Sequence, residues 1–461
     1  MSPTVEQIHQ AIQRTREARD RVQQRTISAI IDALAQTAKH WLHPNSSWRE
    51  RAVAQAPQST GFSEAMVGEA VDLTFGVITE EALGKLLEGC VAPWERRPRH
   101  DRQSEADSPQ PTTAPQLIAH FLAGNVPPPG IESICSGLLL KSANLVKVSS
   151  RDPVFPALFV ESLREVDAAL ADCVAVLDWR REERSLTQAA LAEADAVIAY
   201  GDDETIAAIR KLCRPEVHFL GYGHKLSFAV IAKEALTKKK LASLAGAAAF
   251  DASVYDQQGC LSPHAFYVEE GGQISAREFA AALAEAMATY QARVPRGQLS
   301  VEEAAQIAKL RGAYEFRSAT DKRVAVWASA DATQTEPSLR DAPPQAGTPV
   351  PPQVSGITSS DWLVIYEEDP MFTPSCLNRV VFVKPVERLE LVPELMRRFA
   401  SHLSTVGIAP LDERAVAFAD ELAKLGVSRV CPVGQMQRPS LHWHHDDRPN
   451  LADLLGWTDV R

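Results

Sequence analysis

Cys260 is the residue of this chain best placed to act as a nucleophile. It lies in the segment DQQGCLSPHAFYVE, where a predicted helix ends at Gly259 and a short polar turn precedes a predicted strand. A thiolate attacks carbonyl and thioester carbons readily. A thiol exposed at such a junction, beside backbone N–H donors, is expected to have a lowered pKa and a ready oxyanion site. The plain alternative is an ordinary Gly-Cys turn.

The other cysteines offer no competing pattern. The seven lie at positions 90, 135, 173, 213, 260, 376 and 431, and no two have C-x-x-C spacing. An odd number without paired spacing argues against a disulfide framework or a zinc site. We therefore expect reduced thiols.

Asn125 is the second candidate for chemistry. It precedes three prolines in HFLAGNVPPPGIES, and those prolines stiffen the loop that carries it. An amide NH2 group held by a rigid loop can donate to a developing oxyanion. The alternative is an Asn that only forms a turn before proline.

Three predicted strands end in residues typical of nucleotide binding. Lys147 ends the strand in NLVKVSS, where it can reach a ribose or phosphate, or simply be solvated. Gly201 follows VIAY and precedes a helix, whose free N–H groups favour phosphate. The acidic residues after Gly201 equally suit helix capping. Gly221 and Gly223 form a G-x-G in FLGYGHKLS, a weak dinucleotide fingerprint without a third glycine.

Two further clusters of polar residues have plain alternatives. The segment HWHHDD carries His442, His444, His445 and Asp446, which suggests metal ligands by composition, but no partner motif accompanies it. We expect no metal site and consider a substrate- or interface-lining role at least as plausible. Glu367 and Glu368 follow a predicted strand, where they can act as general bases or form a solvated loop.

Alternating strands and helices must position these residues. Between residues 116 and 240, short apolar strands separated by helical stretches predict a parallel α/β sheet, whose ligands bind beyond the carboxyl ends of the strands. The expected division is a helical region at 1–92, a Pro-rich linker at 93–115, a dinucleotide-binding domain at 116–240, an α/β catalytic domain at 241–435 with a Pro/Gly/Ser-rich excursion at 334–360, and a C-terminal segment at 436–461.

Length and composition exclude several classes of protein. The chain has 461 residues, 45% of them hydrophobic and 23% charged, so it can build two or three cores and is not disordered. Its net charge of −11, with no dense basic run, argues against nucleic acid as a partner. The beginning lacks a signal-peptide pattern, and no apolar run is long enough to span a membrane. We expect a soluble cytoplasmic protein.

Several segments, read together, resemble a known family. GNVPPPG, NLVKVSSRDP, VIAYGDDETI, GYGHKLS, DQQGCLSPH, YEEDPMFTPSCLNRVVFV and VGQMQRPSLHWHHD occur in the order found in acyl-CoA reductases of the bacterial luminescence type, members of the aldehyde dehydrogenase superfamily. The resemblance covers residues 116 to the C-terminus. It implies a Rossmann-like cofactor domain, an α/β catalytic domain and a homo-oligomer.

The resemblance also implies roles for individual residues. Cys260 matches the nucleophile, Asn125 the oxyanion-hole asparagine, and Lys147 the lysine that contacts the adenosine ribose. Gly201 matches the glycine turn beside the dinucleotide. The resemblance favours NADPH, for which Lys147, Ser149 and Arg151 are candidate 2′-phosphate ligands. GYGHKLS lacks the glutamate with which hydrolytic aldehyde dehydrogenases activate water, which agrees with a thioester intermediate that is not hydrolysed.

These expectations define one main hypothesis and two alternatives. The main one is NADPH-dependent reduction of an acyl-CoA thioester, fatty in kind, to the aldehyde through an acyl-Cys260 intermediate, with CoA or a carrier protein as the donor thiol. The first alternative is an NAD(P)-dependent aldehyde dehydrogenase running towards oxidation. The second is a non-catalytic scaffold of the same fold.

Overall fold

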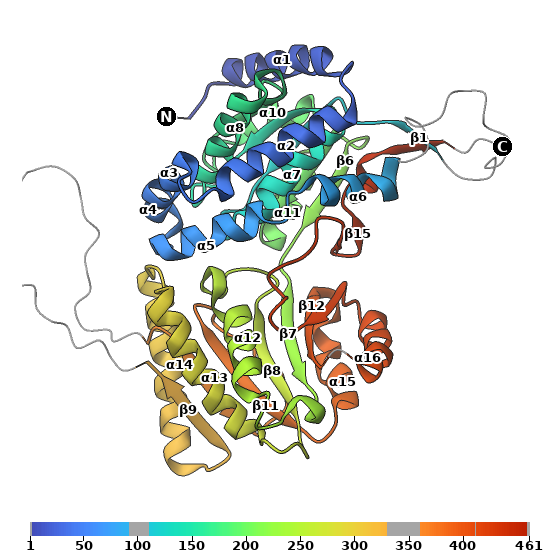
Figure 1. Cartoon of the computed structure of the whole chain (residues 1–461). Coiled ribbons are helices and arrows are strands. Elements are labelled where there is room, and N and C mark those ends of the chain that lie inside the picture. Colours follow the sequence, from blue (N-terminus) through green and yellow to red (C-terminus); the bar gives the residue numbers. More distant parts are fainter. Residues whose placement is uncertain (1, 92–109, 330–359, 411, 459–461) are drawn as a thin grey trace, which may run out of the picture.

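The computed structural model describes residues 2–91, 110–329, 360–410 and 412–458. Two sheets, each flanked by helices, form the upper and lower halves of the molecule, and the chain passes from one to the other between β6 and β7 (Figure 1). No helix in the described ranges is long and apolar enough to cross a membrane.

The upper half contains a five-stranded sheet in which every neighbouring pair is parallel. Its spatial order is β4-β3-β2-β5-β6. Because the order reverses between β2 and β5, the loops after these two strands diverge and leave a crevice at the carboxyl edge. The strands are β2 (Leu117–Phe121), β3 (Ala143–Lys147), β4 (Val174–Leu177), β5 (Ala196–Tyr200) and β6 (His218–Tyr222).

The N-terminal helices share cores with this sheet. Most of their apolar faces pack with α7 and α8 on one face, whereas α1 packs with α10 on the other. Thr4 and Gln7 form a capping box that starts α1. The helices are α1 (Val5–Val22), α2 (Ile27–Leu42), α3 (Ser47–Gln55), α4 (Pro57–Thr60), α5 (Glu64–Phe75) and α6 (Glu80–Val91).

The crossover helices of the upper sheet follow its strands. They are α7 (Pro128–Leu139), α8 (Val154–Val166), α9 (Ala168–Ala171), α10 (Arg184–Ala192) and α11 (Asp203–Leu212). Trp41 of α2 is fully buried, stacks on Phe75 with ring centroids 4.3 Å apart, and donates its indole N–H to Ser162 Oγ at 2.8 Å. This contact fixes α2 on α8.

The lower half contains a seven-stranded sheet of order β13-β12-β7-β8-β11-β10-β9, in which only the β9–β10 pair is antiparallel. Most side chains of its central strands are apolar and buried, as expected for strands covered on both faces. The strands are β7 (Leu226–Ile231), β8 (Pro263–Glu269), β9 (Val324–Ala328), β10 (Leu363–Glu367), β11 (Val380–Val386), β12 (Leu403–Ala409) and β13 (Arg429–Pro432).

Helices α12 and α13 pack on one face of this sheet, and α14, α15 and α16 contribute to the core on the other. Capping boxes start α13 and α14. The elements are η1 (Lys233–Ala235), α12 (Leu241–Ser253), η2 (Val254–Gln257), α13 (Ala276–Arg293), α14 (Val301–Thr320), η3 (Leu389–Leu391), α15 (Val392–Met396), η4 (Arg397–His402) and α16 (Glu413–Lys424).

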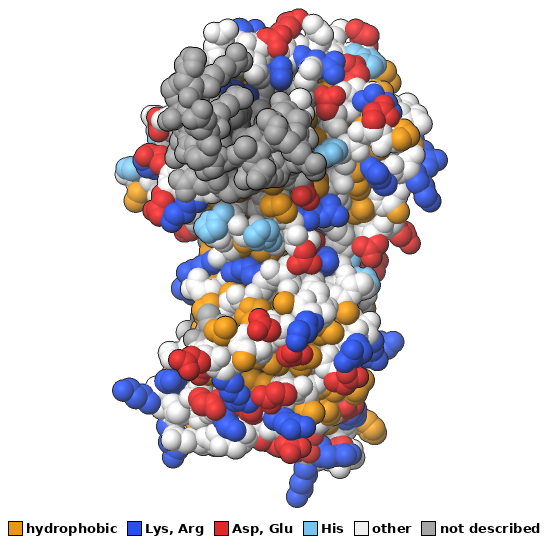
Figure 2. All heavy atoms as spheres, turned by 90° about the vertical axis from the view of Figure 1, so that its right-hand side faces the viewer, with side chains coloured by type: hydrophobic (Ala, Val, Ile, Leu, Met, Phe, Trp, Pro, Cys, Tyr) orange, Lys and Arg blue, Asp and Glu red, His pale blue; other side chains and the backbone are white. Residues whose placement is uncertain are grey.

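The C-terminal segment returns from the lower half to the upper half (Figure 1). It forms the hairpin β14 (His444–His445) and β15 (Arg448–Pro449), then η5 (Ala452–Leu454), and ends in β16 (Gly456–Thr458), which pairs with β1 (Gln110–Thr113). On the face shown in Figure 2, histidines gather where the halves meet, and acidic and basic side chains alternate over the lower half.

The α/β architecture expected from the sequence is confirmed, and the structure differs from the expected division of the chain at two points. Strand β7 belongs to the lower sheet, so the change of sheet falls at residues 223–225, ahead of the expected 240. Residues 110–113, expected within the linker, form β1. The excursion at 334–360 lies almost entirely outside the described residues.

Candidate active site

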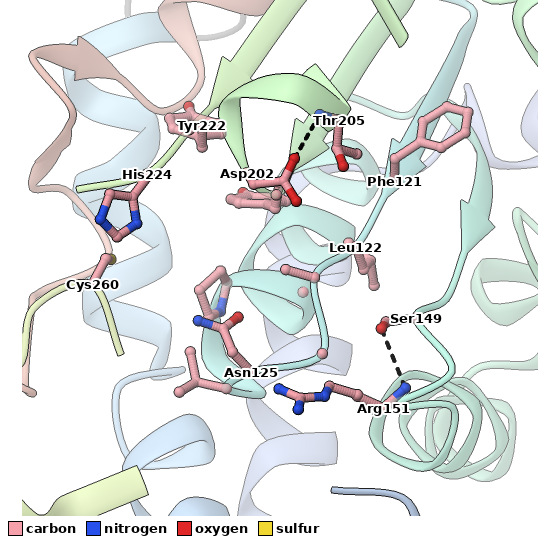
Figure 3. Close-up of a pocket in the computed structure, with 18 of the residues that line it drawn as sticks. Phe121, Leu122, Asn125, Ser149, Arg151, Asp202, Thr205, Tyr222, His224 and Cys260 are labelled. Carbon is pink, nitrogen blue, oxygen red and sulfur yellow. Dashed lines mark hydrogen bonds between the residues drawn. The ribbon is translucent and has the colours of Figure 1, made fainter. Parts of the chain in front are cut away.

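A cavity of about 700 Å3 lies between the two sheets and collects most of the residues singled out in the sequence. Its walls come from the loops after β2, β3, β4, β5 and β6, from the turn before β8, and from the C-terminal hairpin. It therefore occupies the crevice that the strand order predicts. Cys260, Asn125, Lys147, Ser149, Gly201 and Gly223 all line it, and Figure 3 shows several of these side chains pointing into it.

Cys260 lies in the turn between η2 and β8 and is partly exposed to the cavity. Its carbonyl accepts a hydrogen bond from Ser227 Oγ at 2.7 Å, which ties the turn to β7. Burial and the nearby charge of Asp446 raise the pKa of the thiol to about 12, against smaller lowering effects of the N–H groups of Cys260 and Leu261. The expectation of a lowered pKa is therefore wrong: the donors are present, but desolvation outweighs them.

An unusual backbone presents this cysteine. Tyr255, Asp256 and Gln257 all have φ between 50° and 63°, a left-handed conformation that residues other than glycine seldom adopt. Residues 377–379 form a second left-handed stretch opposite. Gln257 joins the two by donating to Val380 O and accepting from Val380 N, both at 2.9 Å. Strain of this kind persists only where surrounding contacts enforce it.

A buried ion pair supplies one of those contacts. The Arg379 Nε donates to Asp256 Oδ1 at 2.9 Å, and both side chains are almost completely buried. Arg379 also donates to Gln291 Oε1 at 2.6 Å and to Val294 O at 2.9 Å. The turn that carries Cys260 is thus anchored to α13 and to the beginning of β11.

Asn125 lies in the loop after β2, across the cavity from the tip of β6 (Figure 3). Its Nδ2 donates to the carbonyl of Gln258 at 2.9 Å, two residues before Cys260. One amide hydrogen is therefore used to hold the cysteine turn, and the second is available to a substrate oxygen. The structure brings Asn125 and Cys260 to the same cavity.

Lys147 and Ser149 lie at the end of β3, and the loop that follows β2 passes close to them. A Cβ on Gly124 would lie 2.6 Å from Arg151 Cβ and 2.7 Å from Ser149 Oγ, so only glycine allows this approach. Burial lowers the pKa of Lys147, opposed by the charges of acidic residues nearby. Arg151 lines the same part of the cavity.

Two arginines that sequence reasoning did not single out also line the cavity. Arg181 lies in the loop after β4 and Arg184 begins α10, and both side chains are exposed. They follow the strand CVAVLDW at the carboxyl edge of the sheet. Their position after this strand could have marked them as ligand-binding candidates. No sequence pattern, however, distinguishes a binding arginine in a polar loop from a solvated one.

The glycine turns after β5 and β6 differ in their relation to the cavity. Gly201 lines it and donates its N–H to Tyr222 O at 3.2 Å. Asp202 caps α11 by accepting from Thr205 N at 2.7 Å, so the acidic residue acts as a helix cap (Figure 3). Gly223 also lines the cavity, whereas Gly221 lies outside the lining, where a Cβ would approach Ile206 at 2.6 Å.

The C-terminal hairpin closes one side of the cavity with aromatic rings. His445 stacks on Tyr222 at 4.3 Å and on Trp443 at 4.7 Å, and Tyr222 stacks on Tyr200 at 4.9 Å. Burial, then Lys225, lowers the pKa of His445 to about 3. Within the described ranges, no group of three or more His, Cys, Asp or Glu side chains is arranged to hold a metal ion.

Two sequence candidates lie away from the cavity, and two residues that line it were not candidates. Glu367 is buried at the end of β10 and pairs with Lys384 at 2.9 Å, and neither it nor Glu368 lines the cavity. His224 and Lys225, which follow the G-x-G turn, line the cavity but were not singled out. Their position directly after β6, at the ligand edge of the sheet, was the signal.

Comparison with solved structures defines the class of fold. A putative aldehyde dehydrogenase from Anabaena variabilis is similar with a TM-score of 0.65 and 15% identity over 100% of this chain and 94% of that one. The glyceraldehyde-3-phosphate dehydrogenase GapN from Methanocaldococcus jannaschii, solved in complex with NADP, gives 0.64 and 12% over 99% and 94%. The chain therefore has the aldehyde dehydrogenase fold.

Comparison of sequences defines the family within that fold. The model of the acyl-CoA reductase (LuxC) family matches residues 22–335 and 353–457, so the chain belongs to this family, as the resemblance implied. Long-chain acyl-protein thioester reductases are similar at 27% identity in Aliivibrio fischeri, over 74% of this chain and 62% of that protein, and at 25% in Photorhabdus luminescens, over 92% and 80%.

Proposed function

We propose that this protein reduces a fatty acyl thioester to the free aldehyde through an acyl-Cys260 intermediate, with NADPH as the electron donor. The observation that carries the proposal is the meeting of Cys260 and Asn125 in one cavity between the two sheets, in a chain of the acyl-CoA reductase family. We place the activity in the cytoplasm and expect a homo-oligomer, as the resemblance implies.

The residues around Cys260 suit acyl transfer. The Cys260 sulfur attacks the thioester carbonyl, and negative charge develops on the carbonyl oxygen. The free amide hydrogen of Asn125 and the backbone N–H of Cys260 stabilise that charge. Collapse of the tetrahedral intermediate releases the donor thiol and leaves an acyl-enzyme. When bound, a reduced nicotinamide would supply the hydride for reducing this acyl group to an aldehyde.

The β6 tip supports reduction over hydrolysis. The segment GYGHKLS holds no carboxylate, and the glycine at its beginning, Gly221, lies outside the cavity lining. A water molecule near an acyl-Cys260 would therefore lack a carboxylate base from this strand. This feature disfavours an aldehyde dehydrogenase that forms the free acid.

The donor thiol is the least constrained part of the proposal. The family description names acyl-CoA, whereas the similar proteins of Aliivibrio fischeri and Photorhabdus luminescens are named for acyl-protein thioesters. We propose acyl-CoA as the donor. A protein-bound acyl thioester is the alternative, because the similar proteins are named for it.

Basic side chains support NADPH over NADH. Lys147, Arg151, Arg181 and Arg184 line the part of the cavity at the ends of β3 and β4. In dinucleotide-binding folds, arginines near this edge accommodate the 2′-phosphate. We propose Lys147 for the ribose and Arg181 and Arg184, beside the expected Ser149 and Arg151, for the phosphate.

The test separates acyl transfer from reduction. Purified protein is mixed with tetradecanoyl-CoA without nicotinamide, and any adduct is located by peptide mass spectrometry; NADPH is then added and the aldehyde measured. We expect an acyl group on Cys260, its release as tetradecanal, and no adduct in Cys260→Ala. Absence of any adduct with acyl-CoA and with acyl-carrier-protein donors refutes the proposal. Release of fatty acid without NADPH supports hydrolysis instead.

A further inference from the structure

The acyl transfer proposed above requires proton movements that Cys260 and Asn125 do not provide. Because burial and Asp446 raise the pKa of the Cys260 thiol to about 12, the sulfur carries its proton when the donor arrives. That proton must leave as the S–C bond forms. The departing donor thiolate must then gain a proton. One side chain that can both accept and donate a proton can do both.

We propose that His224 is the catalytic residue that takes the proton from the Cys260 thiol and delivers it to the departing thiol of the donor. This inference rests on the proposed function and adds a residue to it. His224 follows β6, lines the cavity, and Figure 3 shows its imidazole and the Cys260 side chain directed toward each other.

The backbone holds His224 at this place. Its N–H donates to Asp203 Oδ1 at 3.0 Å, in the first turn of α11. A Cβ on the preceding Gly223 would lie 2.4 Å from the same oxygen, so the absence of a side chain there allows the strand tip to approach the helix. The imidazole is thus presented to the cavity by a fixed main-chain contact.

The other histidines near Cys260 are less suited to this role. His264 accepts the N–H of Ser375 at Nδ1, 3.1 Å away, so its Nε2 carries the hydrogen and has no lone pair to offer. Burial, then the charge of His224, lowers the pKa of His264 to about 4. His445 is held between two aromatic rings and also has a strongly lowered pKa.

The charged groups around the site leave one competitor. Lys225 carries a positive charge, and its Nζ lies 3.5 Å from Ser401 O. His402, whose ring is 6.5 Å from that of His224, is half-exposed beside Asp203 and does not line the cavity. Asp446 lines the cavity, and its buried Oδ1 has no hydrogen-bond partner in the described residues, so it is the alternative base.

The proposed step balances without another reactant. The His224 lone pair accepts the thiol hydrogen, the sulfur electron pair forms the new S–C bond, and the carbonyl π electrons move to oxygen. When the oxygen electrons return, the bond between carbon and the donor sulfur breaks, and that sulfur takes the hydrogen from His224. The products are acyl-Cys260, the free donor thiol and neutral His224.

The test compares two donors whose thiols differ in basicity. Acylation of Cys260 is followed by rapid-quench mass spectrometry with S-tetradecanoyl-N-acetylcysteamine and with the corresponding 4-nitrothiophenyl ester, across pH 5.5 to 9. A 4-nitrothiophenolate leaves without protonation, so it needs no acid. For His224→Gln we expect a loss of about 10²-fold with the alkyl thioester and a clearly smaller loss with the aryl ester. The pH dependence of the alkyl reaction should flatten.

Matched variants keep the inference falsifiable. His402→Gln makes the same substitution outside the cavity and should acylate at the wild-type rate. The inference is overturned if His224→Gln loses the same factor in acylation rate with both donors, or if its rates stay within about threefold of wild type. It is also overturned if Asp446→Asn acylates more slowly by a factor that depends on the leaving group. NADPH affinity measured on each variant controls for folding. A wild-type protein that forms no adduct refutes the proposed function itself.

Discussion

Asn125 is predicted to contribute to both charge stabilisation and positioning. Its amide donates one hydrogen to Gln258 O, and the residue lines the cavity, so the second amide hydrogen can serve a substrate oxygen. We expect Asn125→Ala to slow acylation of Cys260 by about 10²- to 10³-fold, as loss of one oxyanion donor does elsewhere. Asn125→Asp keeps the shape but places a negative charge beside the oxyanion, so it should be at least as slow. The rates are measured by the adduct assay, and an Asn125→Asp enzyme of wild-type rate would contradict the role.

Asp446 should control how readily Cys260 ionises. Burial, the largest cause, raises the pKa of Asp446 to about 6, and at neutral pH its carboxylate raises the pKa of the thiol. We expect Asp446→Asn to lower the thiol pKa and to accelerate iodoacetamide labelling of Cys260 at pH 8 by a few-fold, up to about tenfold per unit of pKa. Labelling is followed by mass spectrometry, and a slower reaction would show that Asp446 acts as a base.

The same carboxyl has a consequence for stability. Because its pKa is higher in the folded than in the unfolded chain, the native state holds the proton more tightly between about pH 4 and pH 6. The stability that it contributes is complete below the unfolded pKa and is lost as the pH rises through about 6. Urea unfolding of Asp446→Asn should show less of this loss than the wild type.

The chemistry-bearing residues were predictable from sequence where a motif marks a strand end. Cys260, Asn125 and Lys147 each follow or end an element whose apolar pattern is clear, and the strand order then brings them to one cavity. The thiol pKa was not predictable, because it depends on the C-terminal hairpin folding back from a distant part of the chain. Arg181 and His224 were missed because a single polar residue in a short loop belongs to no repeating hydrophobic pattern that would mark it.

The two left-handed stretches that present Cys260 depend on a buried ion pair. Removing Arg379 leaves the Asp256 carboxylate buried without its cation, at a cost of about 3–5 kcal/mol in the free energy of unfolding. We expect Arg379→Gln to be destabilised by this amount in urea unfolding and to label poorly at Cys260. The double variant Asp256→Asn with Arg379→Gln removes the unpaired charge and should recover part of the loss; an additive double variant would contradict the coupling.

The β14–β15 hairpin contains a turn that favours glycine. Asp446 and Asp447 join the strands with φ of 51° and 65°, the arrangement of a type I′ turn, in which glycine is preferred at the second position. Asp447 occupies this second position. Asp447→Gly should raise the free energy of unfolding by about 0.5 kcal/mol, the relief of left-handed strain exceeding the entropy cost of glycine.

A matched substitution controls for the general effect of glycine. Asp453 is four residues beyond the hairpin, which ends at Pro449, and is not among the residues with positive φ. Asp453→Gly should therefore destabilise the protein by about 0.5–1 kcal/mol in the same urea titration. If both substitutions destabilise equally, the turn does not select for glycine.

The boundaries of strands were easier to predict than their sheets. Strands β10 (LVIYE) and β11 (VVFVKPV) are apolar runs flanked by polar turns, a local pattern from which a strand can be predicted. Only three residues separate β6 from β7, yet the two strands belong to different sheets. Pairing partners are set by long-range contacts with β8 and β12, which a local pattern does not encode.

Both halves of the protein contribute residues to the one cavity in which we propose that the reaction takes place. The loops of the upper sheet supply Asn125 and the basic side chains at the ends of β3 and β4. The lower sheet carries Cys260 in the turn before β8. A dinucleotide bound across this cavity contacts both, so the cofactor should stabilise the folded chain as a unit. A ligand that binds only the native state adds about 2.7 kcal/mol at one hundred times its Kd.

Cofactor preference can therefore be measured as a thermal shift. We expect NADPH to raise the melting temperature more than NADH at equal concentration, because Arg181 and Arg184 line the cavity where we propose that the 2′-phosphate binds. Replacing both by Ala should weaken NADPH about 10- to 10²-fold, the loss typical of charged hydrogen bonds, and leave NADH within about twofold. Arg180→Ala, a neighbouring exposed arginine outside the cavity lining, serves as the control and should change neither. If both dinucleotides raise the melting temperature of the wild type equally, the proposed preference for NADPH is contradicted. If NADPH raises the melting temperature of the double variant as much as that of the wild type, the 2′-phosphate is instead bound by Ser149 and Arg151.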